Sequence, residues 1–245
     1  YSAVLYPLVR GESAMVAGLT DDQWREFGST LRDVHASALG ERLRGRLPVE
    51  TFSLPSAALV RRLMGLVDEI SFGGAAARLA EFWREHAGRL RWMLDRAEAL
   101  GSSLRTRSFE YVLCHADIHA ANILVGDDER LHLIDWDGPL GAPRERDLLL
   151  VVGSRIARAV EPREEELFFE GYGPVEIDPE ALIYYRYERI IEDLGEFGKS
   201  VFLDPNLDER AREEAELIMS FFAPGGMIEL AETVAPSSAG GWASS

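Results

Sequence analysis

The sequence contains little cysteine, little lysine and no long apolar run. Cys114 is the only cysteine among 245 residues, which excludes an internal disulfide bond and a zinc site built from several cysteines. No stretch of 18 apolar residues occurs, so we expect no transmembrane helix. The first residues show neither the basic nor the apolar region of a secretory signal peptide. These absences together favour a reducing, cytoplasmic setting and no membrane partner.

Positive charge is also scarce. The chain carries 42 acidic against 26 basic residues, a net charge of −16 at pH 7, and Lys199 is its single lysine. A polyanion would be repelled by such a protein, so we expect no nucleic-acid partner. The acidity is compatible with a cationic substrate, although an acidic surface more often serves solubility.

Helical patterns dominate the chain. Thr20 followed by Gln23 forms a capping box, and Asp178 followed by Pro179 is a second helix-start signal. Apolar residues then recur at spacings of three and four, as they do on the buried face of a helix. On these patterns we expect helices over residues 20–39, two or three helices over 54–100 with a break at 72–74, and further helices over 144–160, 179–202 and 207–222.

Strand patterns are few. Residues 122–125 and 131–134 are short apolar runs on either side of a turn, which predicts a β-hairpin. Residues 1–9 predict one further strand, followed by a turn at 10–12. Residues 236–245 are rich in serine, glycine and alanine, and we expect them to be disordered. The fold class that follows is mainly α, of the α+β type, with one small hairpin.

Polar residues gather around the predicted hairpin. Asp117 precedes Asn122 by five residues, and Asp135 directly follows the second strand. Phosphoryl transfer requires a carboxylate that orients an attacking hydroxyl and accepts its proton, together with oxygen ligands that hold Mg²⁺ against the nucleotide phosphates. Asp117 can supply the first function, and Asn122 with Asp135 can supply the second. The spacing therefore predicts a phosphotransferase site.

The motif His115-x-Asp117-x-x-x-x-Asn122, followed twelve residues later by Ile134-Asp135-Trp136-Asp137, resembles the aminoglycoside phosphotransferases and their kinase-like relatives. The resemblance covers most of the chain and is greatest for the spectinomycin-type branch of that family. Four further segments are similar to the family: the hinge-like residues 5–11, the helical residues 31–36, residues 143–147 after the second half of the motif, and the tyrosine-rich residues 184–196.

This resemblance implies the C-terminal lobe of a protein-kinase-like fold. Residues 1–11 would form the last strand of the N-terminal lobe and the hinge, residues 12–235 the helical C-terminal lobe with the catalytic loop, and residues 236–245 a tail. ATP and Mg²⁺ would be the cofactors. The Pro7 carbonyl and the Val9 amide would meet the edge of the adenine.

One part of the family's pattern is missing from the sequence. Members carry a phosphate-covering loop and a lysine that grips the nucleotide phosphates, both in the N-terminal lobe. The chain contains no G-x-G-x-x-G, and Lys199 lies in a C-terminal helix. We therefore expect these 245 residues to lack the N-terminal lobe and to be inactive on their own.

The activity implied is ATP-dependent O-phosphorylation of an aminocyclitol such as spectinomycin, which gives antibiotic resistance. Such a substrate is cationic, so carboxylates on the predicted helix 179–202 are candidates for binding it. Glu188 and Glu192 stand one turn apart and share a face, and Asp193 lies beside them. Arg186 and Arg189 could instead pair with these acids on a solvated face.

Three other functions are open at this point. The same motif serves kinases of other small amino-alcohols, of the choline or homoserine type. A metallohydrolase could use His115, Asp117 and His119 as ligands, completed by Asp135 and Asp137. A non-catalytic, kinase-like binding module is the third.

Overall fold

A computed structural model describes residues 8–38, 42–43, 45–156, 158–204 and 208–233. The expected strand at residues 1–9 falls largely outside these ranges, as does the tail at 236–245. The described chain forms two compact units: unit 1 runs to Glu50 and from Glu110 to Ile177, and unit 2 comprises Thr51–Phe109 and the residues from Asp178 onward. Helices predominate beside small antiparallel sheets, so the predicted fold class is confirmed. No helix among the described residues is long and apolar enough to cross a membrane.

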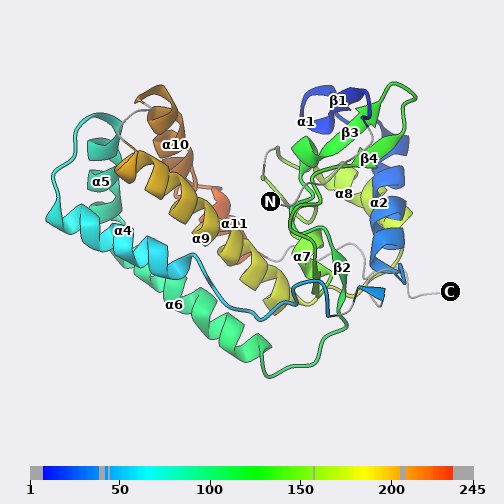
Figure 1. Ribbon diagram of the computed structural model, residues 1–245, viewed down its shortest axis with the longest axis horizontal. Helices are drawn as coiled ribbons and strands as arrows, with labels where there is room; N and C mark the ends of the chain where they lie inside the picture. The colour runs from blue at the N-terminus through cyan, green and yellow to red at the C-terminus, as the bar shows by residue number, and fades with distance from the viewer. Residues whose placement is uncertain (1–7, 39–41, 44, 157, 205–207, 234–245) are drawn as a thin grey trace. The chain divides into compact units, whose positions relative to one another are not determined.

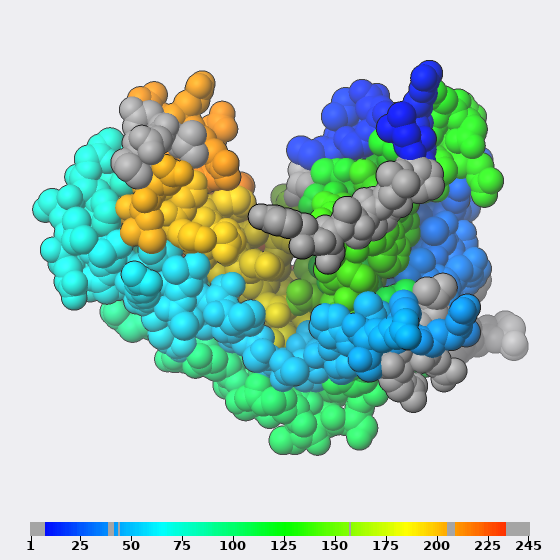
Figure 2. All heavy atoms as spheres, in the orientation of Figure 1, coloured from blue at the N-terminus to red at the C-terminus, as the bar shows by residue number. Residues whose placement is uncertain are grey.

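The predicted hairpin is present in unit 1 and carries a third strand. Strands β3 (Ile123–Gly126) and β4 (Leu131–Leu133) pair antiparallel, and β1 (Gly11–Ser13) pairs with the other edge of β3. In the space-filling view the dark blue start of the described chain lies against the green hairpin (Figure 2). The turn predicted at residues 10–12 is therefore wrong. Glycine at position 11 allows β1 and β3 to approach closely, because a Cβ there would lie 2.2 Å from the Val125 carbonyl oxygen.

A two-stranded sheet and a short helix follow in unit 1. Strand β2 (Val112–Cys114) pairs antiparallel with β5 (Leu140–Ala142), and α7 (Glu145–Leu148) begins shortly after β5. The helix predicted over 144–160 is therefore wrong beyond its first turn. Hydrogen bonds from Leu150 and Val151 reach back only three residues, and Gly153 adopts a left-handed conformation with φ of 55°. The apolar run of this segment is buried all the same.

The two long helices of unit 1 cross at very close range. The capping box of Thr20 and Gln23 starts α2 (Asp21–His35), as predicted, and a second capping box starts α8 (Pro162–Tyr172). The two helices lie side by side (Figure 1). A Cβ on Gly28 would lie 2.0 Å from the Phe168 carbonyl oxygen, and one on Gly171 would lie 2.0 Å from the Arg25 carbonyl oxygen. Glycine at both positions therefore sets the distance between the helices.

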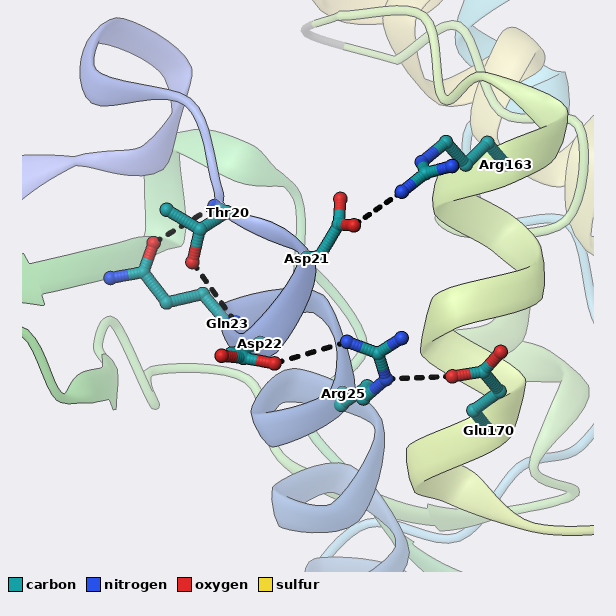
Figure 3. A network of polar contacts seen from close by, with 7 residues as sticks. All are labelled: Thr20, Asp21, Asp22, Gln23, Arg25, Arg163 and Glu170. Carbon is teal, nitrogen blue, oxygen red and sulfur yellow. Dashed lines mark hydrogen bonds and ion pairs between the residues drawn. The ribbon is translucent and has the colours of Figure 1, made fainter.

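Ion pairs fasten the exposed side of this crossing (Figure 3). The Arg25 guanidinium contacts Glu170 on α8 at 2.6 Å and Asp22 on its own helix at 3.0 Å. Asp21, at the start of α2, pairs with Arg163 in the first turn of α8. Exposed pairs of this kind stabilise a fold only modestly, so the buried glycine contacts carry more of the specificity of the crossing.

Unit 2 is a helical bundle. The long helix α9 (Pro179–Leu203) begins at Asp178, whose side chain accepts a hydrogen bond from Ala181 N–H at 3.0 Å, as its sequence predicts. Helices α4 (Ala57–Glu69), α6 (Ala87–Leu104) and α10 (Asp208–Ser220) pack against α9, and α5 (Gly74–Glu85) packs against α10.

The core of unit 2 contains the residues that the sequence marks as apolar. Trp83, Leu90, Met93 and Leu94 are buried, and the break between α4 and α5 falls at residues 70–73. The ring of Trp83 packs edge-on against Phe202 of α9. The short helix α11 (Met227–Ala231) also packs against α9. The helices predicted over 54–100, 179–202 and 207–222 are thus confirmed to within a few residues.

Candidate functional site

The loop between β2 and β3 carries the first half of the motif. It ends in a single 3-10 turn, η1 (Ala120–Asn122), which leads directly into β3. The buried Asn122 side chain donates from Nδ2 to the Asp117 carbonyl oxygen at 2.8 Å and approaches Asp117 Oδ2 at 3.4 Å. His119 Nε2 lies 3.5 Å from the same carboxylate oxygen. Asp117 and Asn122 are therefore brought together, as the motif predicts, and Asp117 remains partly exposed.

His115 ties the loop to the far strand of the hairpin. Its Nδ1 accepts a hydrogen bond from Asp117 N–H at 3.3 Å, and its Nε2 lies 2.8 Å from the Ile134 carbonyl oxygen. The hydrogen bond from Asp117 N–H requires an unprotonated Nδ1, and the contact with the Ile134 carbonyl oxygen requires a hydrogen on Nε2. His115 is therefore a neutral imidazole that bridges two backbone groups. Its ring lies 4.5 Å from that of Trp136. Both ring nitrogens are thus engaged, which leaves neither for a metal ion.

The second half of the motif stands beside the first because of the hairpin register. Ile134 N–H donates to the Asn122 carbonyl oxygen at 3.0 Å, and Asp135 follows immediately. Asp135 has φ of 64°, in the left-handed region that aspartate tolerates better than most residues, and it is exposed. An amide oxygen and a carboxylate from neighbouring strand ends are hard oxygen donors, a donor set that fits Mg²⁺.

The apolar side of the loop is anchored in the core of unit 1. Ile118 is 1% exposed and lies with Ile123, Trp24 and Phe27 around a small cavity beneath the loop. Burial of one isoleucine side chain contributes about 2 kcal/mol, which is enough to favour one loop conformation over others. The alternation of buried Ile118 with the more exposed Asp117 and His119 therefore directs the polar side chains away from the core.

A buried carboxylate holds the backbone just before Asp117. Asp147 of α7 is fully buried, and it accepts hydrogen bonds from His115 N–H at 2.9 Å and from Ala116 N–H at 2.7 Å. Ala116 has φ of 74°, an unfavourable conformation for alanine, which costs about 1–2 kcal/mol. The two charge-assisted hydrogen bonds offset that strain and fix the direction in which the chain enters Asp117.

Asp147 is contacted in turn by His35 of α2, which itself contacts Tyr172 of α8. His35 Nε2 lies 3.0 Å from Asp147 Oδ2, and His35 Nδ1 lies 2.7 Å from the Tyr172 hydroxyl. Burial raises the pKa of Tyr172 to about 12, so its hydroxyl keeps its proton at neutral pH. Nearby, burial and then the Asp147 charge raise the pKa of the Cys114 thiol well above its usual range.

Asp147, His35 and Tyr172 were not predicted as functional residues. Asp147 lies in residues 143–147, a segment that resembles the family but implies no role for this residue, and Tyr172 ends a helix that was not predicted. The α8 start signal was available in Glu161, Pro162 and Glu164. Nothing in the sequence, however, indicates that these helix ends meet near the loop.

The structure also bears on the metallohydrolase alternative. Within the described part of the chain, the one trio of potential metal ligands whose atoms lie within 4.8 Å of one another is His35, Cys114 and Asp147. His115, Asp117 and His119 do not form such a trio. The polar loop is therefore not arranged as a histidine-rich metal centre.

The other predicted site residues lie elsewhere. Val9 is half-buried and stands two residues before β1, whereas Pro7 lies outside the described residues. Glu188, Glu192 and Asp193 lie on α9 in unit 2. Of these, Glu192 is exposed, and Asp193 accepts a hydrogen bond from Arg189 at 3.1 Å. The arginine pairing considered above is thus present for Asp193.

Comparison with known proteins decides the family. Residues 1–185 match the model of a family described as the phosphotransferase enzyme family, APH. The chain belongs to this family. A crystal structure of spectinomycin phosphotransferase, APH(9)-Ia, in complex with ADP and spectinomycin is 31% identical and superimposes with a TM-score of 0.80, covering 92% of this chain and 69% of that one.

Two further structures place this phosphotransferase in context. The AMP-bound complex of APH(9)-Ia is 31% identical with a TM-score of 0.77, covering 94% of this chain and 71% of that one. Choline kinase LicA from Streptococcus pneumoniae is 15% identical with a TM-score of 0.51, covering 85% of this chain and 65% of that one. The latter likeness shows the fold alone. The family match and the likeness to spectinomycin phosphotransferase establish an enzyme of the class that phosphorylates hydroxyl groups.

Proposed function

We propose that this phosphotransferase transfers the γ-phosphoryl group of ATP to a hydroxyl of spectinomycin or a closely related aminocyclitol. The observation that carries the proposal is the 31% identity, at a TM-score of 0.80, to an enzyme whose structure contains ADP and spectinomycin. The likeness to choline kinase is at half that identity and supports the fold only. In a cell, the activity would inactivate the antibiotic and give resistance.

Asp117 would orient the acceptor hydroxyl and take its proton. As the new bond forms between the acceptor oxygen and the γ-phosphorus, the bond from that phosphorus to the bridging oxygen of ADP breaks, and the hydroxyl proton passes to the Asp117 carboxylate. Two contacts support this role. Asn122 Nδ2 and His119 Nε2 both face Asp117 Oδ2, at 3.4 and 3.5 Å, which restricts the rotation of the carboxylate.

Asn122 and Asp135 would hold Mg²⁺. Since Asn122 donates from Nδ2 to Asp117 O, the opposite end of its amide, Oδ1, is the end available to a cation. Mg²⁺, when bound, neutralises charge on the phosphates during transfer. The Ile134–Asn122 backbone hydrogen bond keeps the two side chains on neighbouring strand ends, which is the contribution of this chain to the site.

The remaining assignments concern nucleotide and substrate binding. The Pro7 carbonyl and Val9 amide would meet the adenine, with residues 1–11 as the last strand of an N-terminal lobe and the hinge, and residues 12–235 as the C-terminal lobe. Glu188 and Glu192 would bind amines of the aminocyclitol. Asp193 is a weaker candidate, because Arg189 already compensates its charge.

The experiment is a transfer assay with the full-length protein. Purified enzyme is incubated with ATP, Mg²⁺ and a panel containing spectinomycin, a 4,6-linked aminoglycoside, choline and homoserine, and products are identified by mass spectrometry and ³¹P NMR. We expect a singly phosphorylated spectinomycin-type product that appears only with nucleotide and Mg²⁺. Phosphorylation of choline or homoserine in preference to every aminocyclitol would overturn the substrate assignment.

A further inference from the structure

The crossing of α2 and α8 ends in a buried chain of polar contacts that reaches the loop before Asp117. Tyr172 directly follows Gly171, one of the two glycines at the crossing, and His35 is the last residue of α2. Their side chains meet with 2.7 Å between the Tyr172 hydroxyl and His35 Nδ1, and their rings lie at 77° to one another. Exposure is 4% for Tyr172 and 8% for His35, so solvent competes little for these contacts.

The hydrogen bonds at Asp147 determine whether His35 Nε2 carries a hydrogen. Asp147 receives two backbone N–H groups, which can only donate and which favour the carboxylate form. A carboxylate can only accept, so His35 Nε2, 3.0 Å from Asp147 Oδ2, must carry a hydrogen. The state of Nδ1 then depends on Tyr172 alone among the described residues within hydrogen-bond distance of it.

The Tyr172 hydroxyl determines whether His35 Nδ1 also carries a hydrogen. If His35 were doubly protonated, Nδ1–H would donate to the Tyr172 oxygen, and the hydroxyl hydrogen would need another acceptor. The described residues offer Tyr172 no hydrogen-bond partner besides His35. A buried hydroxyl hydrogen without an acceptor costs about 1–3 kcal/mol. The neutral imidazole, with Tyr172 donating to Nδ1, leaves no such group.

We infer that Tyr172 is a positioning residue for phosphoryl transfer: its O–H donates to His35 Nδ1 and thereby holds His35 as the neutral Nε2–H tautomer that donates to Asp147. Asp147 then holds His115 N–H and Ala116 N–H, and so the backbone that presents Asp117. The inference rests on the proposed role of Asp117 for its effect on turnover, whereas the tautomer and the backbone hold do not depend on that role.

The test is Tyr172→Phe, which removes the hydroxyl and keeps the ring that stacks on Phe168. The matched control is Tyr184→Phe in unit 2, which also removes a buried hydroxyl, one that donates to the Ser53 carbonyl oxygen at 2.9 Å. Three quantities are measured: the ¹⁵N imidazole shifts of His35, identified by the signals lost in His35→Gln; amide hydrogen exchange at His115 and Ala116; and kcat with the KM for ATP.

In the wild-type protein we expect a neutral His35 with its proton on Nε2. In Tyr172→Phe we expect a second tautomer or a protonated ring, faster exchange at both amides, and a kcat lowered about three- to tenfold, the equivalent of one buried hydrogen bond, with the KM for ATP unchanged. Tyr184→Phe should change none of these.

Three results would overturn the inference. They are a doubly protonated His35 in the wild type, an unchanged tautomer and exchange rate in Tyr172→Phe, and an altered tautomer with kcat within twofold of wild type. If spectinomycin is not phosphorylated at all, the proposed function fails, but the NMR and exchange measurements still decide what Tyr172 does.

Discussion

Asp147 Oδ1 accepts a hydrogen bond of 2.7 Å from the backbone N–H of Ala116, one residue before the proposed catalytic base. The contact joins a fully buried carboxylate to a residue with a positive φ. It explains how an alanine can hold a conformation that usually requires glycine. The geometry of the loop is thus set by a residue thirty-one positions away in the sequence rather than by the loop itself.

Replacement of Asp147 by asparagine should destabilise the protein. If the new amide nitrogen faces either backbone N–H, two donors oppose one another in a buried site, and the charge-assisted bonds are lost in any orientation. We expect the free energy of unfolding to fall by about 2–4 kcal/mol. Urea denaturation followed by far-UV circular dichroism measures it. Asp127→Asn, at an exposed turn of the hairpin, is the control and should shift stability by no more than about 0.5 kcal/mol. Equal effects of the two variants would contradict the account.

The helix crossing makes a second prediction about stability. Gly28→Ala and Gly171→Ala each place a Cβ about 2.0 Å from a backbone oxygen of the opposing helix, which only a shift of the helices can relieve. We expect each to cost more than about 3 kcal/mol or to prevent folding. Gly65→Ala in α4 has nothing within 4 Å of the new Cβ and should stabilise the protein by up to about 1 kcal/mol. Thermal melting of the three variants separates the cases, and a stable Gly28→Ala protein would show that the helices do not approach so closely.

Cys114 should not react with thiol reagents in the folded protein. It is fully buried, and its raised pKa keeps it as the unreactive thiol at pH 8. We therefore expect negligible reaction with Ellman's reagent in buffer and one equivalent of released thionitrobenzoate per chain in guanidinium chloride. Rapid labelling of the native protein would mean that strand β2 opens readily.

The acids on α9 give a prediction about substrate binding. A Glu188→Gln, Glu192→Gln double variant should raise the KM for spectinomycin several-fold and weaken its dependence on salt, because two carboxylates no longer attract the amines. The control is Glu196→Gln, an exposed acid one turn further along α9. A KM within twofold of wild type would mean that Glu188 and Glu192 do not bind the substrate, and that the aminocyclitol is recognised elsewhere.

Much of the fold was predictable because its signals are local. The Thr20–Gln23 capping box and the Asp178 N-cap mark helix starts by contacts within three residues, and both are present. The hairpin of β3 and β4 was predictable for the same reason. The end of α7 at Leu148 was not, because no proline marks it: the hydrogen bonds of Leu150 and Val151 reach back three residues, and Gly153 then adopts a left-handed conformation. Strands of three residues, such as β2, are too short to carry a periodic pattern.

In the candidate site, too, the residues with local signals were predictable and the others were not. Asp117, Asn122 and Asp135 are separated by short, fixed spacings on one hairpin, so the sequence alone places them together. The support behind them is not local. Asp147, His35 and Tyr172 come from three helices that are far apart in the sequence, and the close approach of α2 and α8 at Gly28 and Gly171 brings the last two together.

The measurement that tests the central claim most directly is the turnover of spectinomycin by Asp117→Asn in the full-length enzyme. Asparagine keeps the shape of the side chain but cannot accept the proton of the acceptor hydroxyl. We expect kcat to fall by about 10²–10⁴-fold, with ADP affinity within twofold of wild type and with Asp127→Asn fully active. A variant that retained more than about a tenth of wild-type turnover would show that Asp117 is not the base.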